Sequence, residues 1–234
     1  MMRFLCLHGT GTNSQIFETQ TAALRYELGD HHTYEFVEGT IPTNVAPELQ
    51  GSVSLTDGFF AYADLSDRSS CLAALDNLDR YIAAEGPFDA VLAFSQGAAL
   101  ALAYIAQRWA QDPVREQLAP VFKCAVLFSP RNAYEAALQR IADITPATPA
   151  LLHGNIATAS VEVIGIPTAH IWGRNDTDTD ASSVIGLCAS AGRETYIHDG
   201  GHEIPGARTI ASVKGCVQAI RRTVSTAQDA AVAM

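Results

Sequence analysis

The sequence has very little positive charge. Only two of its 15 basic residues are lysines, Lys123 and Lys214, and 25 acidic residues give a formal net charge of −10 over 234 residues. No run of basic residues occurs. Proteins that bind nucleic acid or anionic membrane surfaces gather Lys and Arg on one face. The composition therefore argues against nucleic acid and membranes as partners.

Cysteine is also scarce and forms no pattern. The five cysteines are scattered and odd in number, and none forms a C-x-x-C pair: Cys6, Cys71, Cys124, Cys188 and Cys216. Most of them sit inside apolar stretches. Such cysteines are typical of buried thiols in a reducing compartment, and they argue against a disulfide framework or a zinc site.

No apolar run is long enough to cross a bilayer, which takes about 20 residues. The opening segment, residues 1–9, has too short an apolar run for a signal peptide and predicts a strand instead. We therefore expect a cytoplasmic protein. A length of 234 residues is ordinary for one α/β sheet, so we expect a single domain over residues 1–234.

Short apolar runs alternate with segments of helical spacing along the chain. The apolar runs predict strands at residues 3–7, 33–37, 90–94, 122–128, 166–172 and 194–198. The other segments predict helices at 14–28, 69–85, 96–112, 133–141, 181–191 and 207–224, with a frayed tail from 225 to 234. Buried strands that alternate with helices are typical of a mostly parallel sheet with helices on both faces, so the predicted fold class is α/β.

One long segment, residues 38–67, has neither helical nor strand spacing. It contains Pro42 and Pro47 and an aromatic cluster of Phe59, Phe60 and Tyr62. A segment this long and irregular inside a compact domain is usually functional or disordered, and the aromatic side chains argue against disorder. We predict that it is an insertion that forms a lid or pocket wall; the alternative is a surface loop without a function.

The centre of the sequence carries a strand that runs directly into a serine. Ser95 follows the apolar run, and the residues from Gln96 onwards are rich in Gly, Ala and Leu. Strand, serine and helix without a linker are the pattern of a nucleophile elbow, written G-x-S-x-G. Ala93 and Gly97 supply the small side chains that so sharp a turn needs, although Ala93 stands where the pattern has glycine. The alternative is a strand-to-helix turn with an incidental serine.

The first predicted strand ends in a glycine-rich turn, residues 8–13. A dinucleotide site would need a third glycine and a downstream acidic residue, so the evidence for one is weak. In hydrolases with a nucleophile elbow, such a turn supplies one backbone N–H of the oxyanion hole, and the residue after the nucleophile supplies the other. By this reasoning the donors are the amides of Thr10 and Gln96. His8 is interpreted as a structural histidine that binds the loop backbone.

A serine nucleophile needs a base, and the base needs an acid that orients it. In elbow enzymes the acid and then the histidine follow the nucleophile, each after a later strand. Asp176 and His202 follow the last two predicted strands, so we predict a Ser95–Asp176–His202 triad. The alternative bases are His198, at a strand end, and His170, within a strand. The alternative role for His202 is to cap the closing helix.

Three aspartates at alternate positions resemble the start of a calcium loop: Asp176, Asp178 and Asp180. The glycine and the closing glutamate that such a loop needs are missing, so we expect no metal. Asp178 and Asp180 are the alternatives to Asp176 as the acid. Otherwise one of them caps the helix that follows.

Four stretches of the sequence carry a resemblance to a known family. They are LCLHGTGTN (5–13), GPFDAVLAFSQGA (86–98), HIWGRND (170–176) and GGHEIP (200–205). They are similar to the fungal "family of serine hydrolases", compact α/β-hydrolases that include the stand-alone thioesterase of lovastatin biosynthesis and related enzymes of polyketide clusters. The resemblance implies an α/β-hydrolase fold with Ser95 as nucleophile, Asp176 as acid and His202 as base. It also implies that the amides of Thr10 and Gln96 form the oxyanion hole.

Three hypotheses about activity follow. The first is a cofactor-free thioesterase that releases a polyketide or other hydrophobic acyl chain from coenzyme A or from an acyl-carrier domain of a polyketide synthase. Carrier proteins are acidic, as this chain is, so docking needs a local basic rim, for which Arg131 and Arg174 are the candidates. The second is a carboxylesterase for a small hydrophobic oxygen ester. The third is a binding module with an idle triad, since a fold alone does not prove activity.

Overall fold

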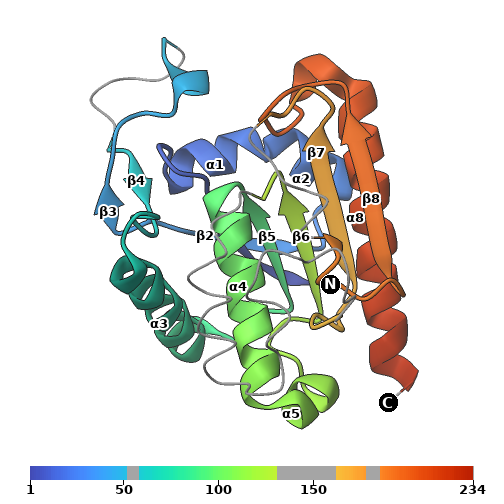
Figure 1. Cartoon of the computed structure of the whole chain (residues 1–234). Coiled ribbons are helices and arrows are strands. Elements are labelled where there is room, and N and C mark those ends of the chain that lie inside the picture. The colour runs from blue at the N-terminus through green and yellow to red at the C-terminus, as the bar shows by residue number, and fades with distance from the viewer. Residues whose placement is uncertain (52–57, 131–161, 178–184, 234) are drawn as a thin grey trace.

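A computed structural model describes residues 1–51, 58–130, 162–177 and 185–233 of the chain. Its central sheet has six strands in the order β2-β1-β5-β6-β7-β8, and every neighbouring pair is parallel. The strands are β1 (Arg3–Leu7), β2 (Thr33–Val37), β5 (Ala90–Phe94), β6 (Cys124–Phe128), β7 (Thr168–Gly173) and β8 (Arg193–His198). The predicted α/β fold with a mostly parallel sheet is confirmed (Figure 1).

Helices cover both faces of the sheet, as Figure 1 shows. On one face lie α3 (Arg68–Glu85) and α4 (Gln96–Gln111), and on the other lie α1 (Ser14–Gln20), α2 (Ala22–Leu28) and α8 (Ile210–Ala233). A short helix, α5 (Pro113–Leu118), follows α4.

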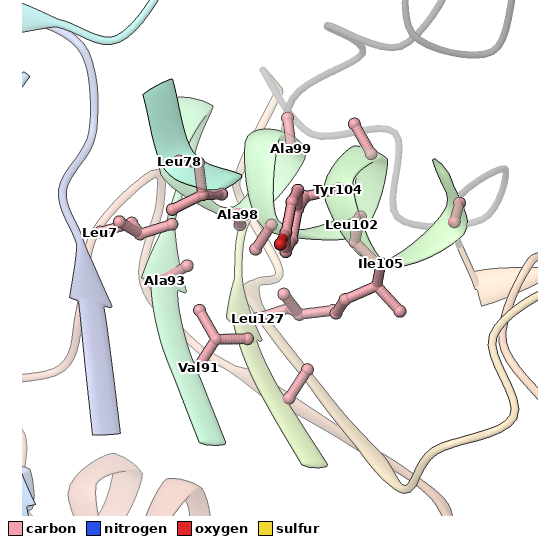
Figure 2. Close-up of a cluster of buried hydrophobic side chains, with 14 of the residues drawn as sticks. Leu7, Leu78, Val91, Ala93, Ala98, Ala99, Leu102, Tyr104, Ile105 and Leu127 are labelled. Carbon is pink, nitrogen blue, oxygen red and sulfur yellow. The ribbon is translucent and has the colours of Figure 1, made fainter. Parts of the chain in front are cut away.

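The sheet divides the interior into two hydrophobic cores. Successive side chains of a strand point to opposite faces. Leu7, Val91 and Ala93 therefore pack with α3 and α4 in the core of Figure 2, whereas Cys6 and Leu92 belong to the core under α1, α2 and α8. Because both faces are covered, the central strands are apolar at every position, which is why they were predictable.

The helix predicted at 14–28 is two helices that meet at Thr21. The hydroxyl of Thr21 donates to the carbonyl oxygens of Phe17 (2.9 Å) and Glu18 (3.2 Å). A hydroxyl that bonds back to the preceding turn competes with the helical ladder and bends or ends the helix. Spacing of apolar residues alone does not reveal this competition.

The predicted frayed tail is wrong, because α8 continues to Ala233. Val224 and Ala227 are buried and belong to the core shared with α2. The side chain of Arg221 also donates to the carbonyl oxygen of Glu27 at the end of α2 (2.6 Å). Contacts with a helix about 200 residues earlier in the sequence therefore extend the closing helix.

The helix predicted at 133–141 lies outside the described residues, and so do residues 181–184 of the helix predicted at 181–191. The rest of the second prediction is wrong, because residues 186–191 are described and are not helical. Cys188 instead forms a parallel bridge with Ile164, and the N–H of Ala189 donates to the carbonyl oxygen of Ile164 (2.8 Å).

The described part of the 38–67 segment contains a small antiparallel pair, β3 (Ile41–Pro42) and β4 (Phe60–Ala61), and a 3-10 turn, η1 (Pro47–Leu49). This pair lies beside the start of α1 in Figure 1. It is joined to the turn after β1, because the N–H of Gly11 donates to Phe60 and the N–H of Phe60 donates to Thr12 (3.0 and 2.8 Å).

The first turn of α4 packs directly against the end of β1. A Cβ at Gly97 would clash with the carbonyl oxygen of Leu7 and lie 2.6 Å from that of His8. Backbone atoms at the centre of a sheet cannot move aside at low cost. Only glycine therefore allows the helix to begin so close to the sheet.

We expect Gly97→Ala to lower the free energy of unfolding by about 1–3 kcal/mol, because the added methyl group overpacks this contact. Urea unfolding followed by circular dichroism measures the effect. Gly206→Ala is the matched control, since nothing lies within 4 Å of a Cβ at Gly206. Equal unfolding midpoints for the two variants would show that the close approach does not constrain the fold.

Candidate active site

Ser95 occupies a strained turn between β5 and α4. Its backbone has φ 53° and ψ −116°, a region that L-residues with a side chain rarely adopt. The turn is held in place on one side by a hydrogen bond from the N–H of Ser95 to the carbonyl oxygen of Phe128 in β6 (2.9 Å). The buried Ala93 fits the position where the elbow pattern has glycine. Strand, strained serine and helix therefore have the geometry of a nucleophile elbow.

Ser95, His202 and Asp176 form a continuous row of hydrogen bonds. Nε2 of His202 lies 2.9 Å from Oγ of Ser95, and Nδ1 of the same ring lies 2.9 Å from Oδ2 of Asp176. The Asp176 side chain is fully buried, whereas the His202 side chain is 11% exposed. The acid is thus shielded from water, and the imidazole can reach both the serine and the solvent side.

Close packing of two late turns brings Asp176 and His202 together. Gly173 lies so close to the carbonyl oxygens of Gly200 and Gly201 that a Cβ there would clash with both. The N–H of Asn175 donates to the carbonyl oxygen of Gly200 (3.0 Å). Parallel strands end at the same edge of a sheet, and these glycines let the loops after β7 and β8 touch.

The rival histidines lie elsewhere. His170 points into the interior of the sheet, with Nε2 3.1 Å from the hydroxyl of Thr168, and burial lowers its pKa to about 4. Nδ1 of His198 accepts the N–H of Gly200 (3.1 Å), and burial lowers the pKa of His198 as well. Neither ring is hydrogen-bonded to Ser95. We therefore interpret both as structural histidines.

His8 is buried under the turn that follows β1. Its Nδ1 lies 2.8 Å from the carbonyl oxygen of Gly9, and its Nε2 accepts the N–H of Gly39 (2.9 Å). These partners assign the proton to Nδ1 in the neutral ring. Burial lowers the pKa of His8, against the opposing effect of Glu38, whose carboxylate lies 3.1 Å from Nε2. The ring therefore braces the loop backbone, as the sequence predicts.

Two backbone N–H groups beside Ser95 have no acceptor among the residues that the structure describes. The amide of Gln96 is the first of α4, so it has no acceptor within the helix. No hydrogen bond among the described residues uses the N–H of Thr10. Gly9 allows the loop to approach, since a Cβ there would lie 3.2 Å from Cβ of Ser95. The positive end of the α4 dipole lies at the same place.

Ser95 and His202 open into a pocket of about 400 Å³. Part of its wall comes from residues 44–49 of the 38–67 segment, and Phe94 and Ile204 add apolar surface. Gln20 and Arg208 also line it, and no motif in the sequence pointed to either residue. A single glutamine or arginine outside the recognised motifs carries no local signal, and only the fold brings it to the site.

The candidates for a basic rim and the alternative acids are not found in the site that the structure describes. Arg174 is 66% exposed and lies 3.5 Å from the carboxylate of Asp199. Arg131, Asp178 and Asp180 lie outside the described residues. In the described ranges, no group of three or more His, Cys, Asp or Glu side chains is arranged to hold a metal ion. None of the helices described is both long and apolar enough to cross a membrane.

Known proteins with similar sequences are fungal hydrolases. The chain is 38% identical over 234 residues to "Esterase FPY3" of Fusarium mangiferae, covering 97% of this chain and 98% of that protein. It is 29% identical over 206 residues to "Hydrolase phiM" of Fungal sp. (strain ATCC 74256), covering 87% and 86% of the two chains.

Among solved structures, a carboxylesterase from Mesorhizobium loti superposes with a TM-score of 0.58 at 18% sequence identity, covering 94% of this chain and 88% of that one. This likeness shows the α/β-hydrolase fold. The sequence profile described as "Serine hydrolase (FSH1)" matches residues 1–213. With its strained serine, its buried acid and its fungal relatives, the chain belongs to the FSH1 serine hydrolase family and is a hydrolase.

Proposed function

We propose that this hydrolase cleaves acyl thioesters and releases a polyketide or other acyl chain in secondary metabolism. Ser95, His202 and Asp176 act as its catalytic triad. The observation that carries the proposal is the row of two 2.9 Å hydrogen bonds that ends at the strained Ser95 in the pocket. A serine so placed next to an oriented imidazole is an activated nucleophile.

The first half of the reaction forms an acyl-enzyme. Oγ of Ser95 attacks the thioester carbonyl while Nε2 of His202 takes its proton. The buried carboxylate of Asp176 stabilises the imidazolium that forms. The amides of Thr10 and Gln96 hold the negative oxygen of the tetrahedral intermediate. As the intermediate collapses, the carbon–sulfur bond breaks and His202 returns the proton to the leaving thiol.

The second half hydrolyses the acyl-enzyme. A water molecule gives its proton to Nε2 of His202 and attacks the ester carbon, and the same two amides hold the oxyanion again. The carbon–oxygen bond to Ser95 breaks, His202 protonates the serine, and the carboxylic acid leaves. No cofactor takes part in these steps.

Arg208 supports a leaving group that carries a phosphate. It lies on the turn η4 (Ala207–Thr209), lines the pocket with Ser95 and has no ion pair among the described residues. In a chain of net charge −10, an arginine at the pocket is suited to attract an anion. The phosphopantetheine arm of coenzyme A or of an acyl-carrier domain has such a phosphate next to its thiol-bearing chain. Arg208 therefore replaces Arg174, which faces Asp199, as the candidate for the basic rim.

An oxygen ester is the second candidate substrate. The relative from Fusarium mangiferae bears the name "Esterase FPY3", and its similarity covers almost the whole chain. The same residues in the same roles would hydrolyse a small hydrophobic oxygen ester, since only the leaving group differs.

Matched substrates separate the two. We expect kcat/KM for a thioester to exceed that for the oxygen ester of the same acyl group by about tenfold, which corresponds to about 1.4 kcal/mol of transition-state stabilisation. Steady-state hydrolysis of an acyl series, long and short, polar and apolar, measures the ratio and identifies the preferred acyl group. A tenfold preference for the oxygen ester would favour the second candidate.

Labelling with a fluorophosphonate tests the triad itself. We expect the intact mass of the wild-type protein to rise by one phosphonyl group, and Ser95→Ala to show no gain. His202→Ala should label more slowly by about a thousandfold or more, because the serine loses its base. Ser225→Ala, an exposed serine on α8, is the control and should label like the wild type. Labelling of Ser95→Ala would assign the nucleophile elsewhere.

Arg208→Gln tests the phosphate contact. We expect KM for an acyl-coenzyme A to rise about two- to fivefold, the range of an exposed ionic contact, with kcat unchanged. KM for the N-acetylcysteamine thioester of the same acyl group, which has no phosphate, should not change. Arg174→Gln is the matched control. Equal changes for both thioesters would mean that Arg208 does not bind the phosphate.

A further inference from the structure

We propose that the side chain of Gln96 and the segment Phe60–Ala63 together fix the geometry of the oxyanion hole, and that Gln96 is a positioning residue for it. The proposal rests on the proposed function, because it concerns the amides of Thr10 and Gln96 to which the oxyanion was assigned. In this proposal, residues 60–63 hold the backbone that carries the two oxyanion donors in a fixed position. We call these residues the brace.

The Gln96 side chain is buried and fully engaged with this segment. Its Oε1 accepts the N–H of Tyr62 (2.7 Å) and more weakly that of Ala63 (3.4 Å), and its Nε2 donates to the carbonyl oxygen of Ala63 (2.8 Å). Because each partner is a backbone group of fixed polarity, the orientation of the amide is unambiguous. The residue whose backbone N–H is an assigned oxyanion donor is thus anchored through its side chain.

The same segment holds the other half of the hole. The N–H of Gly11 donates to the carbonyl oxygen of Phe60 (3.0 Å), and the N–H of Phe60 donates to the carbonyl oxygen of Thr12 (2.8 Å). These two bonds hold the two residues that directly follow Thr10, whose amide is the second assigned donor. The loop is also packed tightly on its outer side, since a Cβ at Gly11 would lie 2.8 Å from the carbonyl oxygen of Asn44.

Tyr62 ties the segment to the sheet. Its hydroxyl accepts the N–H of His8 (3.0 Å) and donates to the carbonyl oxygen of Val37 (2.8 Å) at the end of β2. Its ring packs on the His8 ring at a centroid distance of 4.7 Å. The chain from Phe60 to Ala63 therefore connects β1, β2, the loop of Thr10 and the start of α4.

Such bracing matters because an oxyanion hole works by preorganisation. Donors that are fixed before reaction stabilise the developing charge without reorganising, and removing one donor costs about 10²–10³ in kcat. A shift of either amide by a fraction of an ångström would lose part of that effect. The substrate ground state depends on these amides much less, so the loss should fall on kcat rather than on KM.

Gln96→Met tests the brace, since methionine has a similar length but makes none of the three hydrogen bonds. We expect kcat to fall about 10- to 100-fold with KM nearly unchanged. The affinity for a boronic acid, which forms a tetrahedral adduct with Ser95, should fall by the same factor. Gln96→Glu keeps the acceptor for Tyr62 and should restore part of both. Circular dichroism and the unfolding midpoint report on folding separately.

Gln107→Met is the matched control, because Gln107 is a second buried glutamine of α4, whose Oε1 has no hydrogen-bond partner. It should leave kcat and boronic acid affinity unchanged. The proposal is overturned if Gln96→Met keeps kcat near the wild-type value, if Gln107→Met lowers kcat equally, or if kcat falls while boronic acid affinity does not. If Gln96→Met does not fold, Gln96→Glu, which loses the donor to Ala63, takes its place: its kcat and its boronic acid affinity should fall together by a smaller factor, and an unchanged kcat overturns the proposal. Failure of the proposed function would appear differently, as absence of fluorophosphonate labelling at Ser95 in the wild type.

Discussion

The close contact between the first turn of α4 and the end of β1 is the constraint on which the site depends. Gly97 permits it, because any side chain there would clash with the backbone of Leu7 and His8. The contact forces the sharp turn in which Ser95 takes a positive φ, and it places the amide of Gln96 beside the loop of Thr10. The positions of the proposed nucleophile and of the proposed oxyanion donors are therefore consequences of one packing arrangement.

A second close approach positions the other two residues of the proposed triad. The loops after β7 and β8 touch at Gly173, Gly200 and Gly201, and from them Asp176 and His202 reach the serine. Parallel strand order makes this possible, because all six carboxyl ends lie at one edge of the sheet. The two side chains differ in burial, and the shielded carboxylate of Asp176, the proposed acid, orients the imidazole of His202, the proposed base.

The described residues of the 38–67 segment fall into two parts with different relations to the site. Residues 44–49 line the pocket, whereas residues 60–63 contact the backbone that carries the two assigned oxyanion donors. Residues 44–49 are therefore suited to selecting the substrate. Residues 60–63 are suited to fixing the positions of the two backbone amides. Within one irregular segment, substitutions in the wall can alter specificity while the brace is kept.

The sequence by itself determined the parallel α/β sheet, the elbow at Ser95 and the order in which Asp176 and His202 follow. These features are readable because buried strands are apolar at every position and because tight turns demand small residues locally. Only the tertiary structure decided that the Gln96 side chain is hydrogen-bonded to the backbone of residues 62 and 63, that Arg208 lines the pocket, and that α8 extends to Ala233. Each of these depends on contacts between residues far apart in the chain, for which no local pattern exists.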